Sequence, residues 1–508
     1  MPFISKSKYI SGLQCHKLLW FYYNAKDQIP AFDAQTQAIF DQGHLVGELA
    51  RKLYPGGIEV AGDAKDFGRI LELSKEALTH RKPLFEAAFK SGMKASFNRA
   101  QPLRKDAFYP EAFARADILN PVGKSDWEII EVKSSTEVKE VNLHDLALQR
   151  YAYEGAGLSI SKCLILHINN KYVRKGEIDP KKLFTKTDVT DEVRELLKSV
   201  PANLQTMVNV IRQKSSPVVE ISPHCSDPYG CPMQEVCWKF LPENNPLTLY
   251  YLKKDKAFEL IHDGHLDIRK LPGSVNLSDR QDIQVKALRN GKKHIDKVGL
   301  REFLEKLEYP LYYLDFETFG TAIPLYDEVR PYEQIPFQFS LHIVESEGKK
   351  PHHESFLADG KSDPRPEILR RLKKLLGQKG SIVAYNAPFE KDKLKKASAI
   401  FKEYAKWYQS IESRFVDLLA PFKSFYYYHP DQCGSASIKA VLPALTGKSY
   451  EDLEIAKGGT ASLEYLRVTY GDVDEKERQK VRNQLEKYCA QDTEGMILMV
   501  DELVKIAC

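Results

Sequence analysis

Two acidic residues inside an apolar strand constrain this chain more than any other feature. Asp315 and Glu317 stand two apart in the run YPLYYLDFETFG, which is otherwise apolar and aromatic. Side chains two apart in a β-strand point to the same face, so the two carboxylates share one face. Burying them is costly unless something neutralises their charge, and a pair of divalent cations would do so. The pattern therefore predicts a metal site on a strand of an α/β domain.

Two later segments carry polar groups that could complete this site. GSIVAYNAPFEKDKL predicts a buried strand, a turn and a helix that carries Glu390, with Asp392 as an alternative ligand. EKYCAQDTEGMILMVDELVK predicts an amphipathic helix on which Tyr488 and Asp492, four apart, share a face. Asp417 lies in a predicted loop, where we expect it to cap or orient a neighbouring segment.

A separate acidic constellation stands in the first third of the chain. RADILNPVGKSDWEIIEVKSS contains Asp117, a turn-rich gap and a predicted strand over 127–132. Glu131 and Lys133 share a face of that strand, and Asp117 can meet Glu131 around a hard divalent cation if it ends the preceding strand of a hairpin. Such a site lowers the pKa of a bound water, and Lys133 can steady the attacking hydroxide or the transition state. An exposed hairpin that holds no metal is the alternative.

Three neighbouring residues strengthen the metal interpretation. His44 lies on a predicted amphipathic helix in FDQGHLVGELARKL, where a neutral imidazole could complete the metal shell. Gln149 and Tyr153 are four apart on the helix-like stretch LALQRYAYEGAG, so they share a face and could hold a phosphate or a base. For each of them a packing or surface role is the alternative.

Four cysteines form a pattern of metal ligands. Cys15 stands near the start, and Cys225, Cys231 and Cys237 are each separated from the next by five residues. Thiolates are soft ligands that suit zinc or an iron–sulfur cluster, and this wide spacing favours a 4Fe-4S cluster over zinc. Four unrelated buried thiols are the alternative. The other cysteines lack such a pattern and are expected to be core or incidental: Cys163, Cys433, Cys489 and Cys508.

The charge of the chain is concentrated in one segment. The 508 residues carry a formal charge of +4, and residues 246–300 alone hold 11 Lys and Arg against 7 Asp and Glu. We interpret this segment as a basic helical connector between a domain over 1–245 and a domain over 301–508. Lys253, Lys254 and Lys256 open its first helical pattern and could contact nucleic acid, although a solvated linker face would look the same.

Composition excludes several classes of protein. Hydrophobic residues make up 43% of the chain and aromatic residues 11%, enough for sizeable cores, so a disordered or collagen-like chain is excluded. No run of about 18 apolar residues predicts a membrane span, and the first residues lack the apolar stretch of a signal peptide. We therefore expect a cytoplasmic protein without membrane partners.

The first half resembles a known group of nucleases. The segments SKSKYISGLQCHKLLWF, GHLVGEL, RADIL, EVKSS and QRYAY, followed by the three late cysteines, resemble RecB-like PD-(D/E)XK nucleases that carry an iron–sulfur cluster, such as the CRISPR-adaptation nuclease and the nuclease domain of AddB. The resemblance implies a central mixed sheet with flanking helices. It also implies that His44, Asp117 and Glu131 are metal ligands, Lys133 is catalytic, Gln149 and Tyr153 form an accessory motif, and the four patterned cysteines bind the cluster.

The second half resembles another nuclease group. An acidic pair on a strand, Asn-x-x-Phe-acid at a helix start and Tyr-x-x-x-Asp on a late helix are similar to the motifs of DnaQ-like DEDD exonucleases of the Tyr type, on a ribonuclease H-like fold. The resemblance implies that Asp315, Glu317, Glu390 and Asp492 bind two metals about 4 Å apart and that Tyr488 positions the water. Glu390 stands where that family usually has Asp. LDFET, NAPFEK and CGSASIKAVLPAL also resemble a domain family of unassigned function.

The combined prediction is an α/β protein with two metal-dependent nuclease centres. Mg²⁺ or Mn²⁺ would serve both sites, and single-stranded or end-exposed DNA is the expected substrate, trimmed from its 3′ end by the second half. RNA remains an alternative substrate. From another class, a nucleic-acid-binding or sensing protein with one degenerate site and a structural cluster is the alternative function.

Overall fold

The chain folds into two compact units, each with its own sheet. The computed structural model describes residues 3–61, 66–91 and 111–508. Unit 1 comprises 1–238 and 321–332, and unit 2 comprises 239–320 and 333–508. The stretch expected as a connector, 246–300, lies within unit 2, where Phe258, Ile268 and Val285 are buried. The fold is mixed α/β, as the sequence predicts at that level.

Unit 1 is built on a six-stranded mixed sheet with strand order β2-β3-β6-β7-β8-β9. The strand β7 pairs with β6 in antiparallel fashion and with β8 in parallel fashion. A smaller sheet has the order β1-β5-β4. The strands of both sheets are β1 (Ile4–Ser5), β2 (Ile58–Glu59), β3 (Leu84–Phe85), β4 (Ala88–Lys90), β5 (Ala112–Arg115), β6 (Ile118–Val122), β7 (Asp126–Lys133), β8 (Ser159–Ile168) and β9 (Phe184–Asp188).

Helices surround these strands and bury their apolar faces. The helix α5 contributes Leu146, Leu148 and Ala152 to a core that also includes Ile129 and Ile165 of the central strands. The helices of unit 1 are α1 (Lys6–Gln14), α2 (His16–Asn24), α3 (Ala34–Arg51), α4 (Phe67–Leu78), α5 (Glu140–Gly155), α6 (Pro180–Leu183), α7 (Thr190–Leu197), α8 (Val200–Ile211) and α9 (Gln234–Trp238).

Unit 2 is built on a five-stranded mixed sheet with strand order β13-β12-β11-β14-β15. A two-stranded ribbon joins β10 and β16. The central strand β11 pairs with β12 in antiparallel fashion and with β14 in parallel fashion. The strands are β10 (His294–Ile295), β11 (Leu311–Phe319), β12 (Ile335–Val344), β13 (His352–Leu357), β14 (Ile382–Ala384), β15 (Phe415–Asp417) and β16 (Tyr427–Tyr428).

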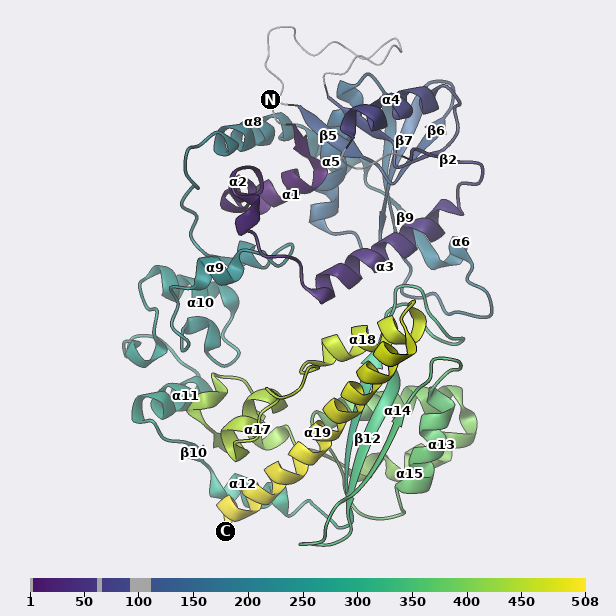
Figure 1. Cartoon of the computed structure of the whole chain (residues 1–508). Helices are drawn as coiled ribbons and strands as arrows, with labels where there is room; N and C mark the ends of the chain where they lie inside the picture. The colour runs from purple at the N-terminus through teal and green to yellow at the C-terminus, as the bar shows by residue number, and fades with distance from the viewer. Residues whose placement is uncertain (1–2, 62–65, 92–110) are drawn as a thin grey trace. The chain divides into compact units, whose positions relative to one another are not determined.

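The two faces of β11 have different surroundings. Leu314 and Phe316 join a core with Ile368 and Leu394, which come from the helices on one side. The alternate residues face the other side, where α19 runs beside β11 and β12 (Figure 1). The helices of unit 2 are α10 (Lys254–His262), α11 (Asp279–Asn290), α12 (Lys297–Leu304), α13 (Arg365–Leu375), α14 (Ala387–Ile400), α15 (Ala405–Ile411), α16 (Ala420–Lys423), α17 (Ile438–Thr446), α18 (Gly458–Tyr470) and α19 (Glu475–Ala507).

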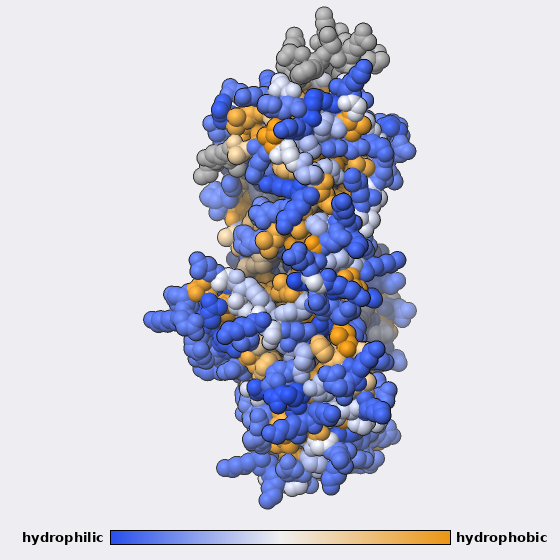
Figure 2. Space-filling view, turned by 90° about the vertical axis from the view of Figure 1, so that its right-hand side faces the viewer, coloured by the Kyte–Doolittle hydropathy of each residue, from blue (hydrophilic) through white to orange (hydrophobic). Residues whose placement is uncertain are grey.

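The face of the molecule that Figure 2 shows is mostly polar. Figure 2 shows one face of the molecule, on which hydrophilic residues predominate and apolar residues form small, separate patches. Scattered exposed apolar side chains are normal for a folded protein. Among the helices of the described residues, none is both long enough and apolar enough to cross a membrane.

Candidate functional site

Three carboxylates of unit 2 converge at one point. Asp315 and Glu317 of β11 and Asp492 of α19 each present an oxygen atom, and these atoms lie within 4.8 Å of one another. Among the described residues this is the one group of three His, Cys, Asp or Glu side chains that meets this spacing. Glu317 and Asp492 are buried, with 7% and 6% of their surface exposed. We call Asp315, Glu317 and Asp492, with the neighbouring Glu390, the second acid cluster. The oxygen atoms of the first three are close enough together to hold a cation.

The helix α19 is held on the sheet by polar contacts beside the cluster. Gln338 of β12 donates a hydrogen bond to the Leu485 carbonyl at 2.9 Å, and the hydroxyls of Ser340 and Thr493 lie 2.7 Å apart. Asp492 directly precedes Thr493 in α19. These contacts therefore determine where the Asp492 carboxylate lies relative to β11. The cluster is thus placed by the register of α19 on the sheet.

Glu390 adds a fourth carboxylate to the second acid cluster. It lies on the first turn of α14 and is only 2% exposed, and its Oε2 atom has no hydrogen-bond partner. Burial and the nearby Asp315 raise the pKa of Glu390 well above its usual range. A buried acceptor without a partner is rare in folded proteins and indicates a bound ion, a water or a functional role.

The alternative ligand Asp392 faces a different environment. Its Oδ2 atom accepts hydrogen bonds from Lys393 and Lys396, each at 2.9 Å. Asp417 accepts hydrogen bonds from the backbone N–H groups of Asn386 at 3.0 Å and Ala387 at 3.3 Å, so it caps the start of α14. The expected capping role of Asp417 is confirmed.

The charges of the second acid cluster oppose one another. Burial, followed by repulsion from neighbouring carboxylates, raises the pKa values of Asp315 and Glu317 well above their usual range. Burial also raises the pKa of Asp492 to about 6, although Tyr450, Lys439 and other neighbours act in the opposite direction. Carboxylates with these raised pKa values favour protonation, or a bound cation, over bare negative charge.

Tyr488 belongs to a small polar network at the edge of the cluster. Its hydroxyl accepts a hydrogen bond from Lys439 Nζ at 2.8 Å, and Tyr450 donates a hydrogen bond to Asp492 Oδ1. Cys489 Sγ lies 3.5 Å from Asp315 Oδ2, so this cysteine contacts the cluster rather than being incidental. The sequence prediction missed Lys439, Tyr450 and this role of Cys489.

The first acid cluster consists of Asp117, Glu131 and Asp145 and lies around the end of β7. Asp117 stands just before β6, and the antiparallel pairing of β6 with β7 brings it beside the end of β7. Asp117 was expected to end the first strand of the hairpin, and it instead directly precedes that strand. The antiparallel pairing still brings it next to Glu131. Asp117 Oδ2 accepts a hydrogen bond from the Val132 N–H at 2.7 Å. Burial and the neighbouring Glu131 raise the pKa of Asp117 to about 7.

Two lysines neutralise the first acid cluster. Lys133 Nζ lies 2.7 Å from Glu131 Oε1 and 2.9 Å from Asp145 Oδ2. Lys6 Nζ, at the start of α1, lies 2.8 Å from the same Glu131 oxygen. Burial alone would raise the pKa of Glu131, but the two ammonium groups hold it well below its usual range. Lys6 and Asp145 carry no pattern of their own and were missed by the sequence prediction.

The predicted accessory residues split into two roles. Gln149 Nε2 donates to Glu131 Oε2 at 2.6 Å and to Asp145 Oδ1 at 3.1 Å, so it belongs to the first acid cluster. The hydroxyl of Tyr153 accepts a hydrogen bond from the Ala116 N–H at 2.9 Å and donates to the Ala87 carbonyl. Tyr153 is fully buried and ties α5 to the strands behind the cluster.

His44 lines the same cleft as Asp117 and Glu131 of the first acid cluster. The cleft has a volume of about 1010 Å³ and is lined by His44 of α3 together with Asp117, Glu131 and Lys133. The ligand atoms of His44, Asp117 and Glu131 do not all lie within 4.8 Å of one another in the described structure. Four predicted residues of the first site therefore line one cleft without closing a three-ligand shell, whereas the predicted accessory residues Gln149 and Tyr153 are buried behind it.

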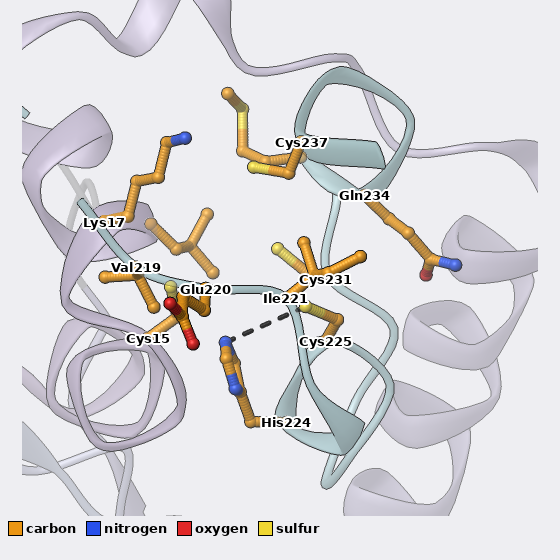
Figure 3. Close-up of a pocket in the computed structure, with 12 residues that line it drawn as sticks. Cys15, Lys17, Val219, Glu220, Ile221, His224, Cys225, Cys231, Gln234 and Cys237 are labelled. Atoms are coloured by element: carbon orange, nitrogen blue, oxygen red, sulfur yellow. Dashed lines mark hydrogen bonds between the residues drawn. The ribbon is translucent and has the colours of Figure 1, made fainter. Parts of the chain in front are cut away.

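The four patterned cysteines line one pocket of unit 1. Figure 3 shows Cys15, from the junction of α1 and α2, facing the segment that carries Cys225, Cys231 and Cys237. All four thiols are free. Burial raises the pKa values of Cys15 and Cys231, in the latter case to about 11. Four thiols converge without forming disulfides, so the pocket offers the donor set of a thiolate-bound metal centre.

A hydrogen-bonded glutamine holds the two sides of this pocket together. Gln14 Nε2 donates to the carbonyls of His224 at 2.8 Å and Tyr229 at 2.6 Å. His224 Nε2 lies 3.7 Å from Cys225 Sγ, the contact dashed in Figure 3. Gln14 directly precedes Cys15, so one turn of the chain carries both the first thiol and the side chain that holds the opposite segment.

The three connector lysines lie at the exposed start of α10. Lys253 is the residue before the helix, and Lys254 and Lys256 stand in its first turn. Lys256 Nζ pairs with Glu259 at 2.9 Å. The helix forms as the sequence predicts.

Comparison with known proteins gives similarity without an assigned activity. Residues 312–437 match a family described as a domain of unknown function (DUF2779). Uncharacterized proteins of Mycoplasma pneumoniae and Mycoplasma genitalium are 29% and 27% identical over 41% and 39% of this chain. These matches cover 34% and 33% of the two relatives, so the chain spans about a third of their length. The family match includes Asp315, Glu317 and Glu390 and ends before Tyr488 and Asp492.

Proposed function

We propose that this chain is a metal-dependent nuclease with two centres, of which the second is a 3′-to-5′ exonuclease of the DEDD type. The observation that carries the proposal is the second acid cluster. Asp315, Glu317 and Asp492 converge within 4.8 Å, and the buried Glu390 beside them has an oxygen without a partner. Hard divalent cations prefer carboxylate ligands, so the donor set fits Mg²⁺ or Mn²⁺.

The residues of the second site divide the work between them. Asp315, Glu317, Glu390 and Asp492 would hold the cations, which when bound supply positive charge to the phosphate and lower the pKa of water. Tyr488 can hold the attacking water through its hydroxyl. The extra methylene of Glu390, compared with an aspartate, is compatible with this role because its carboxylate is buried next to Asp315.

The first site would form the other nuclease centre, on a RecB-like PD-(D/E)XK unit. Asp117 and Glu131 offer hard oxygen ligands beside a cleft, and His44 lines the same cleft. Lys133 and Lys6 bring two ammonium groups to Glu131, where they could stabilise the negative charge of a phosphate. Gln149 orients Glu131 by a hydrogen bond to its second oxygen.

We infer that the thiol pocket holds a 4Fe-4S cluster rather than zinc. Tetrahedral Zn–S bonds of about 2.3 Å place thiolates about 3.8 Å apart. Across the described residues, no three of the four patterned cysteines have sulfur atoms within 4.8 Å of one another. Protein purified without oxygen should therefore contain iron and absorb visible light, and Cys231→Ser should lose both. A colourless protein that contains zinc would contradict the 4Fe-4S assignment.

Single-stranded DNA, or DNA with an exposed end, is the proposed substrate. The carboxylates of the second site are buried, so a scissile phosphate reaches them more readily from a strand that is not paired. The proposal is tested by incubating the full chain with 5′-labelled single-stranded DNA and Mn²⁺. A ladder of products shortened from the 3′ end is expected, and the same assay with labelled RNA decides between the two nucleic acids.

Two substitutions on one helix make this assay specific. Glu390→Gln should reduce 3′ shortening by about 100-fold or more, since even indirect partners of metal ligands change activity by about 10- to 100-fold. Asp392→Asn, two residues away on α14, should leave the rate unchanged because Asp392 pairs with lysines. Equal rates of 3′ shortening in the wild type, Glu390→Gln and Asp392→Asn would contradict an exonuclease centre at this site.

A nucleic-acid-binding protein with a degenerate first site is the second candidate. The pairing of Glu131 and Asp145 with Lys6 and Lys133 favours it, because the cluster is already neutralised without a metal. Under this alternative, Glu131→Gln leaves every nuclease product unchanged. Under the two-centre proposal, Glu390→Gln still forms the products of the first centre, and adding Glu131→Gln to that variant removes them.

A further inference from the structure

Lys439 lies at the second site and has no assigned role. It stands in the first turn of α17, and its ammonium donates hydrogen bonds to the Tyr488 hydroxyl at 2.8 Å and to the Ala456 carbonyl. The ammonium also lies 4.7 Å from the centre of the Tyr488 ring. Its hydrogen-bond partners are therefore a phenol and a backbone carbonyl rather than a carboxylate, which is unusual for a half-buried lysine beside an acid cluster.

A close helix contact brings Lys439 to this position. Gly495 of α19 packs against Leu442 of α17, where an added Cβ would lie only 2.7 Å from Leu442 Cδ2. Leu442 is three residues after Lys439, and Gly495 is seven residues after Tyr488, so each pair shares a helix face. The absence of a side chain at Gly495 lets α17 approach α19 closely enough for the lysine to reach the phenol.

The contact determines which way the phenol proton points. A tyrosine hydroxyl has one proton to donate and lone pairs to accept with. Because Lys439 can only donate, it occupies an acceptor position of Tyr488 and directs the phenol proton elsewhere. Asp492 stands four residues after Tyr488 on the same face of α19, so the acid cluster lies beside this hydroxyl.

We propose that Lys439 is a positioning residue of the second site, which holds the Tyr488 hydroxyl in place and turns its proton toward the side of the acid cluster. This inference rests on the proposed exonuclease function, in which Tyr488 holds the attacking water. A phenol without this anchor can rotate about its C–O bond and donate to other acceptors. Lys439 thus acts on catalysis through Tyr488 and not by contact with the nucleic acid.

A double-mutant cycle in the full chain separates these two roles. Lys439→Met should lower kcat for 3′ shortening by about tenfold, the effect of losing about 1.4 kcal/mol of transition-state stabilisation, with little change in KM. In the Tyr488→Phe background, Lys439→Met should cause no further loss. Lys439→Arg, which can still donate to the phenol, should retain more activity than Lys439→Met. A multiplicative loss in the double variant would overturn the inference.

A second readout does not depend on nuclease activity. With tyrosine labelled at the ring carbon that bears the hydroxyl, the NMR signal of Tyr488 is identified by its loss in Tyr488→Phe. That signal should shift in Lys439→Met and stay in place in Lys505→Met, a control on the exposed end of α19. If the chain cleaves no nucleic acid, the proposed function is wrong. The shift of the Tyr488 signal still tests whether Lys439 holds the Tyr488 hydroxyl. An unchanged Tyr488 signal in Lys439→Met would contradict the inference.

Discussion

The two acid clusters of this chain balance their charge in different ways. In the first cluster, Asp117, Glu131 and Asp145 are accompanied by Lys6 and Lys133, whose ammonium groups contact two of the three carboxylates. In the second cluster, Lys439 lies near Asp315, Glu317 and Asp492, but its ammonium donates its hydrogen bond to Tyr488. Lys393 lies near Glu390 and pairs with Asp392. Two lysines offset most of the charge of the first cluster, whereas the carboxylates of the second cluster must take up protons or cations to avoid a large negative charge.

The difference appears in the pKa values. The lysines hold the pKa of Glu131 below its usual range, whereas burial and repulsion raise the pKa values of Asp315, Glu317 and Glu390. A cluster whose carboxylates are paired in advance is stable by itself, and a cluster whose carboxylates repel one another needs protons or cations. The stability of unit 2 should therefore depend on bound metal much more strongly than the stability of unit 1.

The largest change in the free energy of unfolding is expected when one of the two lysines that offset the charge of the first acid cluster is removed. Lys6→Met leaves Glu131 with one ammonium instead of two and should lower the free energy of unfolding by about 1–3 kcal/mol. Because the pKa of Glu131 is depressed in the folded state, this contribution is present above its unfolded value of 4.5 and is lost as the pH falls. Denaturant unfolding at about pH 7 and at about pH 3 measures both effects, because the contribution is lost only below 4.5, as the pH falls toward the depressed folded pKa of Glu131.

Lys124→Met is the control for that experiment. Lys124 is exposed at the tip of the hairpin formed by β6 and β7, in the same sheet as Glu131. It should change the unfolding free energy by less than about 0.5 kcal/mol. If Lys6→Met and Lys124→Met behave alike, Lys6 does not compensate the charge of Glu131.

The opposite response is expected in the second cluster. Without metal, Asp315→Asn should stabilise the protein, because it removes one charge from a group of mutually repelling carboxylates. Each kcal/mol gained corresponds to a rise in Tm of about 2–4 °C for a domain of this size. Thermal unfolding in the presence of a chelator measures this shift.

The pH dependence of this stabilisation has a definite sign. The folded pKa of Asp492 is about 6 against an ordinary value of 3.8, so the folded state binds more protons than the unfolded state between these values. The metal-free protein therefore loses stability as the pH rises through this window. The advantage of Asp315→Asn should grow over the same range. A destabilised Asp315→Asn at neutral pH would contradict strong repulsion in the cluster.

The smallest effect is expected at the start of α10. Replacing Lys253 and Lys254 by Glu should weaken the binding of single-stranded DNA and reduce the slope of log affinity against log salt by about 0.7 for each phosphate that these lysines neutralise. Lys256→Glu should have less effect because Lys256 already pairs with Glu259. Titration at several salt concentrations measures the slopes, and unchanged slopes would make this segment a solvated surface.

Sequence periodicity was sufficient to find groups that share one element. Asp315 and Glu317 share a strand face, Tyr488 and Asp492 share a helix face, and the helices and strands that carry them form where expected. The wider α/β architecture follows from the same apolar patterns. The sequence also anticipated that four distant cysteines meet, because three of them recur at a regular interval.

The lysines of both clusters could not be found in this way. Lys6 contacts a carboxylate 125 residues away, and Lys439 contacts a phenol 49 residues away. Neither lysine stands in a periodic pattern, and their importance comes from packing that the local sequence does not encode, such as the close approach of α17 to α19 at Gly495. Charge compensation of this kind becomes visible only in three dimensions.

The most direct test of the account is the binding of Mn²⁺ to the metal-free full chain, measured by calorimetry at neutral pH. Tight binding of the same stoichiometry is expected in the wild type and in Asp392→Asn. In Asp492→Asn the part of this binding that unit 2 contributes should be lost, so that the stoichiometry falls. Binding of the same affinity and stoichiometry in Asp492→Asn would contradict the claim that the repelling carboxylates of unit 2 form a metal centre.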